Sequence, residues 1–222
     1  MSTPPQVVPI FATPLGVVKL AALAGANTAL AALFIARALP RWRDPGADPP
    51  PGTFRGRDDL SQWPEPQVQL LLGEMLAGVT SVASGISELT REQFDSLKPE
   101  FRGWFSIIGP DGYLAPENHP NTSWTAVYCV SSPPASPMRT DSGVLRLQEF
   151  RPGNMFMDAA QGTARIPYRP GHCVWRPVIG EMAVFPGWIA HEVALLRADN
   201  PLVLVTARVR YVGSDQPWMP PW

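Results

Sequence analysis

From Phe101 to Val212 the chain is a series of short apolar runs separated by Gly, Pro and Asn, and this pattern restricts the fold more than any other feature. Runs of this length, rich in β-branched and aromatic residues, are typical of strands bounded by turns. The candidate strands are Gly103–Ile108, Ser123–Val130, Gly143–Phe150, Ala164–Tyr168, Val174–Pro177, Glu181–Phe185, Ile189–Leu195 and Leu202–Val212. Such a series predicts a double-stranded β-helix, a jelly roll of the cupin-like type.

A stretch without charge from Leu20 to Ala36 predicts the first of three helices in the N-terminal part. Its many alanines, with polar residues near its centre, favour a helix of a soluble protein over a membrane span, which prefers larger apolar side chains. Apolar spacing gives this helix one broad buried stripe. The expected stripe is Leu20, Leu23, Asn27, Leu30 and either Leu33 or Phe34.

Two more helices are expected before residue 100. One covers about 66–84 and has apolar residues spaced for a buried face. The other is short, begins at the capping box Thr90–Gln93 and ends before Pro99. Prolines make residues 6–14 a predicted edge strand, and the proline-rich stretch 41–57 a predicted loop.

These patterns predict one domain, mainly β with a helical N-terminal part. Residues 1–100 form a helical lead-in packed on one outer face, residues 101–213 form the jelly-roll core, and residues 214–222 form a tail. The tail contains Trp218 and Trp222, which a disordered segment would seldom carry. We therefore expect it to cover a pocket or to contact a second copy in a homodimer.

Composition excludes several classes of function. The net charge is −1 and there is no long run of Lys or Arg, so neither nucleic acid nor a membrane surface is an expected partner. Cys129 and Cys173 are the only cysteines, too few for a disulfide scaffold or a zinc site built on sulfur. The expected location is the cytoplasm, and the expected partner is a small-molecule substrate.

Two of the three histidines lie in settings that suggest a metal site. His191 follows the candidate strand Glu181–Phe185 after a Pro-Gly turn, and His119 lies in the segment 116–124. Two imidazoles and a carboxylate from separate strands are the ligands of a mononuclear non-haem iron centre. Glu117 is two residues from His119, so both side chains point the same way in an extended chain. Glu117 is either the third ligand or a nearby base. The remaining histidine, His172, lies in a predicted turn and is the weaker candidate.

Several separated stretches carry a resemblance to a known family. They are Pro9–Pro14, His119–Tyr128, Ser142–Leu145 with Arg151-Pro152, and Gly180–Val193. The chain resembles the bacterial "putative 2OG-Fe(II) oxygenases" of the 2-oxoglutarate/Fe(II)-dependent dioxygenase superfamily. The resemblance implies a jelly roll, Fe(II) and 2-oxoglutarate as cofactors, and oxidation of a small molecule with release of succinate and CO2. We expect hydroxylation of an amino-acid-like or secondary-metabolite substrate.

The chain departs from this family at two positions. Members have His-x-His-Pro where this chain has Glu117-Asn-His119-Pro120, and they have a co-substrate-binding Arg where this chain has Leu202. The last strand offers a replacement, because alternation places Arg208 and Arg210 on one face with Thr206. A guanidinium suits the distal carboxylate of 2-oxoglutarate because its planar fork donates two parallel hydrogen bonds.

Arg208 is the first choice for this role and Arg210 the second. Hydroxyls from Thr206 and Tyr128 are expected beside it, and Trp188 and Arg146 are candidates for the substrate pocket. Two alternatives stay open. One is a cupin-like metalloenzyme that does not use 2-oxoglutarate, which the missing arginine favours. The other is a non-catalytic jelly-roll binding module in which Glu117 marks a decayed iron site.

Overall fold

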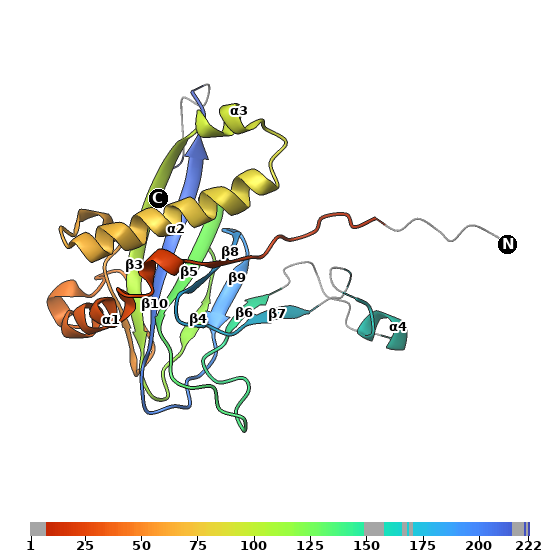
Figure 1. The fold of residues 1–222 in the computed structure, drawn as a ribbon. Helices are drawn as coiled ribbons and strands as arrows, with labels where there is room; N and C mark the ends of the chain where they lie inside the picture. The colour runs from red at the N-terminus through yellow and green to blue at the C-terminus, as the bar shows by residue number, and fades with distance from the viewer. Residues whose placement is uncertain (1–7, 149–157, 166–167, 169–170, 215–219, 221) are drawn as a thin grey trace.

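Two antiparallel sheets form the body of the molecule (Figure 1). The computed structural model describes residues 8–148, 158–165, 168, 171–214, 220 and 222. The large sheet has the order β1-β8-β5-β10-β3-β2 and the small sheet the order β4-β9-β6-β7. The strands are β1 (Gly16–Lys19), β2 (Thr53–Arg55), β3 (Lys98–Ile108), β4 (Leu114–Glu117), β5 (Trp124–Ser131), β6 (Leu145–Gln148), β7 (His172–Trp175), β8 (Glu181–Pro186), β9 (Ala190–Val193) and β10 (Leu202–Val212).

The two sheets share an apolar interior. Leu145 and Val193 of the small sheet belong to one buried cluster with Val127, Phe185 and Leu204 of the large sheet. The inward residues of β10 alternate with outward ones, as a strand between two packed layers requires. This arrangement confirms the predicted mainly β, jelly-roll class.

Helices cover the other face of the large sheet (Figure 1). They are η1 (Ala21–Leu23), α1 (Asn27–Ala36) and α2 (Pro66–Gly85), while η2 (Pro40–Trp42), η3 (Leu60–Gln62), α3 (Arg91–Asp95) and α4 (Ala159–Gly162) are short. The predicted stripe is confirmed, since Leu20, Leu23, Asn27, Leu30 and Phe34 are buried, whereas Leu33 is only partly so. Thr90 forms the predicted capping box with Gln93.

Helix α2 is long and apolar enough to cross a membrane by length and composition alone. Its residues Val68, Leu71, Met75 and Val79 are buried in the cluster that joins the helices to the large sheet. An amphipathic helix packed on a sheet passes the same test. We propose that helices and sheets form one domain, because this cluster also contains Val205 of β10.

Three expectations about strands were wrong. Residues 8–14 form no strand, and residues 6 and 7 lie outside the described part. The edge strand begins later, at Gly16. Pro9 and Pro14 precede it and lack the N–H group that pairing with a neighbouring strand needs. The expected loop 41–57 contains β2, which pairs with β3 at the sheet edge. Residues 1–100 are therefore not helical alone, because they add two strands to the large sheet.

The segment Ala164–Tyr168 is the third error. No strand includes Ala164, Arg165 or Tyr168, and residues 166 and 167 lie outside the described part. The last two residues of the expected strand Gly143–Phe150, 149 and 150, also lie outside it. Strand β4 was missed, because Pro116 interrupts its short apolar run; it lies at the edge of the small sheet, where proline is tolerated. Of the tail, Trp222 is described, whereas Trp218, like Arg151 and Pro152, is not.

Candidate metal centre

Glu117, His119 and His191 come together between the two sheets. Glu117 ends β4 and pairs in register with His191 of β9, and His119 follows in the turn after β4. The ligand atoms of the three side chains all lie within 4.8 Å of one another. The antiparallel pairing of β4 with β9 therefore places residues far apart in the sequence at one point.

His191 is 4% exposed, and its orientation is fixed by the backbone. Its Nδ1 lies 3.1 Å from the carbonyl oxygen of Ile189, so Nδ1–H donates and Nε2 is left as an acceptor. Nε2 lies 4.0 Å from Oε1 of Glu117. Burial lowers the pKa of His191, which keeps the imidazole neutral near pH 7.

His119 presents a buried nitrogen to the same point. Its Nε2 has no hydrogen-bond partner among the described residues, and its ring stands 5.3 Å from that of His191 and 5.4 Å from that of Trp104. Burial lowers the pKa of His119 to about 4. Its backbone N–H donates to the carbonyl of Gly187 at 2.7 Å. A Cβ at Gly187 would lie 2.4 Å from a backbone oxygen, so this close approach requires glycine.

Glu117 supplies the negative charge of the cluster. Burial raises the pKa of its carboxyl, but the Arg55 guanidinium and the two imidazoles outweigh this effect, and the pKa is lowered overall. Its Oε2 accepts a hydrogen bond of 2.8 Å from Arg55, whereas Oε1 faces His191. The side chain is 29% exposed.

This set of groups fits a divalent iron ion. Two neutral imidazoles and one ionised carboxylate are the donors that Fe(II) takes in a facial triad, and none needs to lose a proton at neutral pH. The unpartnered Nε2 of His119 is a buried polar atom that a metal would satisfy. The ligand roles of Glu117, His119 and His191 remain predictions, now with a geometry that supports them.

The sequence around the candidate ligands matches a known enzyme family. The family model described as "putative 2OG-Fe(II) oxygenase" matches residues 102–205, which include all three candidate ligands. The matched residues make up just under half of the chain and, together with the candidate metal centre, indicate a 2OG-Fe(II) oxygenase. It is therefore a non-haem iron dioxygenase with Fe(II) and 2-oxoglutarate as cofactors. No curated protein matches it.

Solved structures show the same fold. A Pseudomonas putida prolyl-4-hydroxylase is 19% identical, with a TM-score of 0.59 and coverage of 88% of this chain and 91% of that chain. HygX from Streptomyces hygroscopicus, with nickel and 2-oxoglutarate bound, is 12% identical, with a TM-score of 0.57 and coverage of 92% and 84%. A Trichoplax adhaerens prolyl hydroxylase with a hypoxia inducible factor peptide is 10% identical, with a TM-score of 0.53 and coverage of 88% and 82%.

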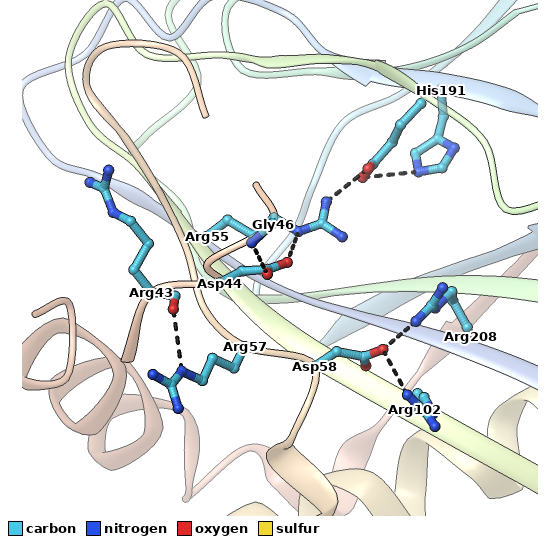
Figure 2. Close-up of polar contacts among 10 residues, drawn as sticks. Arg43, Asp44, Gly46, Arg55, Arg57, Asp58, Arg102, His191 and Arg208 are labelled. Carbon is cyan, nitrogen blue, oxygen red and sulfur yellow. Dashed lines mark hydrogen bonds and ion pairs between the residues drawn. The ribbon is translucent and has the colours of Figure 1, made fainter. Parts of the chain in front are cut away.

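In this oxygenase, Arg208 lies on the inner face of the large sheet. Arg208 pairs in register with Thr125 on one side and Arg102 on the other, so the three side chains share the face that meets the metal cluster. Nε of Arg208 and Oγ1 of Thr125 are buried without a hydrogen-bond partner among the described residues. Arg208 also forms an ion pair with Asp58 (Figure 2). A carboxylate of 2-oxoglutarate fits these unpartnered donors.

Leu202 stands where the family resemblance implies an arginine, and this position is apolar. Leu202 is 1% exposed and belongs to the buried cluster with Leu145 and Leu204. A carboxylate placed there would be buried among these apolar side chains, at a high desolvation cost. Thr206 lies one step from Arg208 on the same face, opposite Trp104 and Val127, and is 3% exposed.

Two of the predicted co-substrate residues are placed elsewhere. The Tyr128 hydroxyl donates to Oδ1 of Asn27 at 2.7 Å, on the helix-covered face of the large sheet. The expectation for Tyr128 is corrected, because alternation in β5 turns it away when Thr125 points inward. Arg210 donates to Glu100 at 2.6 Å and to the carbonyl of Pro220 at 2.6 Å, so its guanidinium is already satisfied.

The two candidate substrate residues also gain no support. Arg146 forms ion pairs with Glu192 at 3.2 Å and Asp141 at 3.8 Å, while its neighbours Leu145 and Leu147 face the interior. It therefore lies on the outer face of the small sheet, and the expectation that it lines the pocket is corrected. Trp188 is 41% exposed in the turn between β8 and β9.

A pocket of about 340 Å³ borders Glu117, whereas His119 and His191 do not line it. Asp44, Arg55 and Glu117 line it together with the loop 46–50 and residues 114–116. Sequence reasoning missed Arg55 because it lies in the expected loop 41–57. It also missed Thr125, although alternation with Val127 and Cys129 in an otherwise apolar strand is a signal that would have singled out this inward hydroxyl.

Proposed function

We propose that this oxygenase hydroxylates a small amino-acid-like or secondary-metabolite substrate and releases succinate and CO2. The observation that carries the proposal is the convergence of Glu117, His119 and His191, with two neutral imidazoles and one ionised carboxylate. When bound, Fe(II) and 2-oxoglutarate supply the oxygen-activating chemistry, and the protein supplies binding, orientation and exclusion of water.

Glu117, His119 and His191 would hold the iron as its three protein ligands. We assign the distal carboxylate of 2-oxoglutarate to Arg208, with Thr125 as a second donor and Thr206 nearby. A guanidinium and a buried hydroxyl on neighbouring strands give this carboxylate charge-assisted hydrogen bonds in a region of low dielectric. Phe185 packs against His191 at 5.0 Å and helps to exclude water from the imidazole.

We propose that the substrate enters through the pocket beside Glu117. Its volume of about 340 Å³ lies within the range of small-molecule sites, roughly 300–1,000 Å³. Relatives of the same fold differ in what they bind, since HygX has a structure with hygromycin B and the Trichoplax enzyme one with a peptide. The size of the pocket favours a small molecule here.

The decisive experiment is an anaerobic titration of the metal-free protein with Fe(II) and 2-oxoglutarate. We expect a weak visible absorption band that needs both additions, and O2-dependent succinate formation that increases with a suitable amine or amino-acid substrate. Iron binding without any effect of 2-oxoglutarate would overturn the assigned co-substrate site and indicate an enzyme that uses the metal alone.

Location and assembly are further proposals. A cytoplasmic location follows from the low cysteine content. A homodimer through the tail has less support than the sequence suggested, because Trp222 packs on Arg210 of its own chain, with the guanidinium 4.4 Å from the ring centroid. Analytical ultracentrifugation of the full chain measures the oligomeric state directly.

A further inference from the structure

Arg55 connects the metal cluster to the pocket. It lies at the end of β2, and its Nη1 donates to Oε2 of Glu117 at 2.8 Å (Figure 2). Its guanidinium carbon lies 4.1 Å from the ring centroid of Trp104, and Nε lies 3.6 Å from Oδ2 of Asp44. Asp44 is itself held by the backbone N–H of Gly46 at 2.9 Å. Arg55 therefore has a fixed place between Glu117 and the loop that walls the pocket.

This contact divides the two oxygens of the Glu117 carboxylate. Oε2 is taken by Arg55, while Oε1 lies 4.0 Å from Nε2 of His191 and faces the metal cluster. Arg55 thus holds Oε2 on the side away from the imidazoles, so Oε1 is the oxygen that a metal at this cluster would meet first. The planar guanidinium suits this task, because it donates to Glu117 along one edge while its face packs on Trp104.

Glu117 needs such a restraint more than the two histidines do. It lies on the short edge strand β4, where the pairing with β9 is irregular between Leu114 and Glu117. Its side chain is 29% exposed, whereas that of His191 is 5% exposed and His119 is buried. A long, partly exposed side chain loses rotamer freedom when it binds a metal, and a neighbour that fixes it beforehand reduces that loss.

We propose that Arg55 is a positioning residue that fixes Glu117 as a one-oxygen ligand of the metal. This inference rests on the proposed metal centre. Partners that orient a ligand typically change metal affinity by about 10- to 100-fold when they are removed.

The test is Co(II) binding to the metal-free full chain, measured by calorimetry and by the visible absorption spectrum, which responds to coordination. Arg55→Leu is expected to weaken Co(II) binding by about 10- to 100-fold and to alter the spectrum. Arg55→Lys keeps the positive charge but lacks the planar guanidinium, so we expect a Co(II) affinity between those of the wild type and Arg55→Leu. Arg57→Leu is the control, because Arg57 lies two residues away, is exposed and donates to the carbonyl of Arg43.

A double-mutant cycle separates positioning from a general structural effect. In a Glu117→Gln background, which weakens the ligand itself, Arg55→Leu should cause little further loss of affinity. An equal loss in both backgrounds, or wild-type affinity and spectrum in Arg55→Leu, overturns the inference while leaving the metal centre intact. If Arg55→Leu does not fold, Arg55→Lys with Glu117→Gln completes the cycle. Failure of the wild-type chain to bind Co(II) overturns the metal centre and this inference together.

Discussion

The two ends of the jelly-roll interior are built from the same strands but differ in chemistry. At one end Leu202 and Leu204 of β10 pack with Leu145 in a fully apolar cluster. At the other end the same face of β10 carries Arg208, beside Thr125. Alternation keeps one face of the strand inward along its whole length, so a change in residue type alone converts a core into a site.

The difference shows how the fold divides stability from chemistry. The apolar end removes surface from water and adds no polar group that needs a partner. The polar end contains buried atoms without protein partners, among them Nε2 of His119 and Oγ1 of Thr125, whose burial has a cost that a metal and a co-substrate would offset. Substitutions at the apolar end should therefore lower stability, whereas substitutions at the polar end should lower the affinity for metal or co-substrate.

The largest expected effect is at the metal centre. His191→Ala removes a buried ligand, and we expect no measurable Co(II) or Mn(II) binding by calorimetry. His172→Ala is the matched control, because His172 is exposed on β7 and lies outside the cluster. Retention of wild-type affinity in His191→Ala would remove the basis of the proposed function.

At the apolar end, Leu204→Ala should lower the free energy of unfolding by about 2–5 kcal/mol, because Leu204 is fully buried and the cavity cannot close completely. Urea denaturation of the metal-free protein measures this change. Co(II) affinity of the folded variant should stay at the wild-type value. A marked loss of affinity would show that the two ends are not independent.

Arg208→Ala tests the polar end directly. The loss of charge-assisted hydrogen bonds of roughly 1.5–3 kcal/mol should weaken 2-oxoglutarate binding by about 10- to 100-fold, with little change in Co(II) affinity. Calorimetry on the Co(II)-loaded protein measures both. Arg210→Ala is the control, because its guanidinium is satisfied by Glu100 and Pro220. If Arg210→Ala weakened 2-oxoglutarate binding and Arg208→Ala did not, the carboxylate would be assigned to Arg210.

Thr125→Val is expected to have the smallest effect. It keeps the shape of a fully buried side chain and removes only the hydroxyl, so 2-oxoglutarate binding should weaken by about 10-fold, from one hydrogen bond to a charged group of roughly 1.5 kcal/mol. Because Oγ1 has no hydrogen-bond partner among the described residues, the free energy of unfolding should not fall. A clear loss of stability would mean that the hydroxyl serves the fold and not the co-substrate.

Sequence reasoning located some of these residues by alternation alone. It placed Thr206, Arg208 and Arg210 on one face of the last strand, and the register of the strand with β3 and β5 agrees. It paired Glu117 with His119 through their spacing, and the cluster contains both. It could not tell which face of Ser123–Val130 meets the site. This strand lies between the helices and the small sheet, so both of its faces are apolar and alternation does not distinguish them. Tyr128 was therefore assigned to the wrong side.

The sequence by itself determined the elements with strong local periodicity, such as the buried stripe of α1, the capping box at Thr90 and the alternation of β10. It also supplied the two imidazoles. Only the tertiary structure decided that Arg55 reaches Glu117 and that Arg210 is taken by Glu100. Periodicity reports which way a side chain points within its own element, whereas partners from distant segments depend on strand pairing and sheet packing that no local pattern encodes.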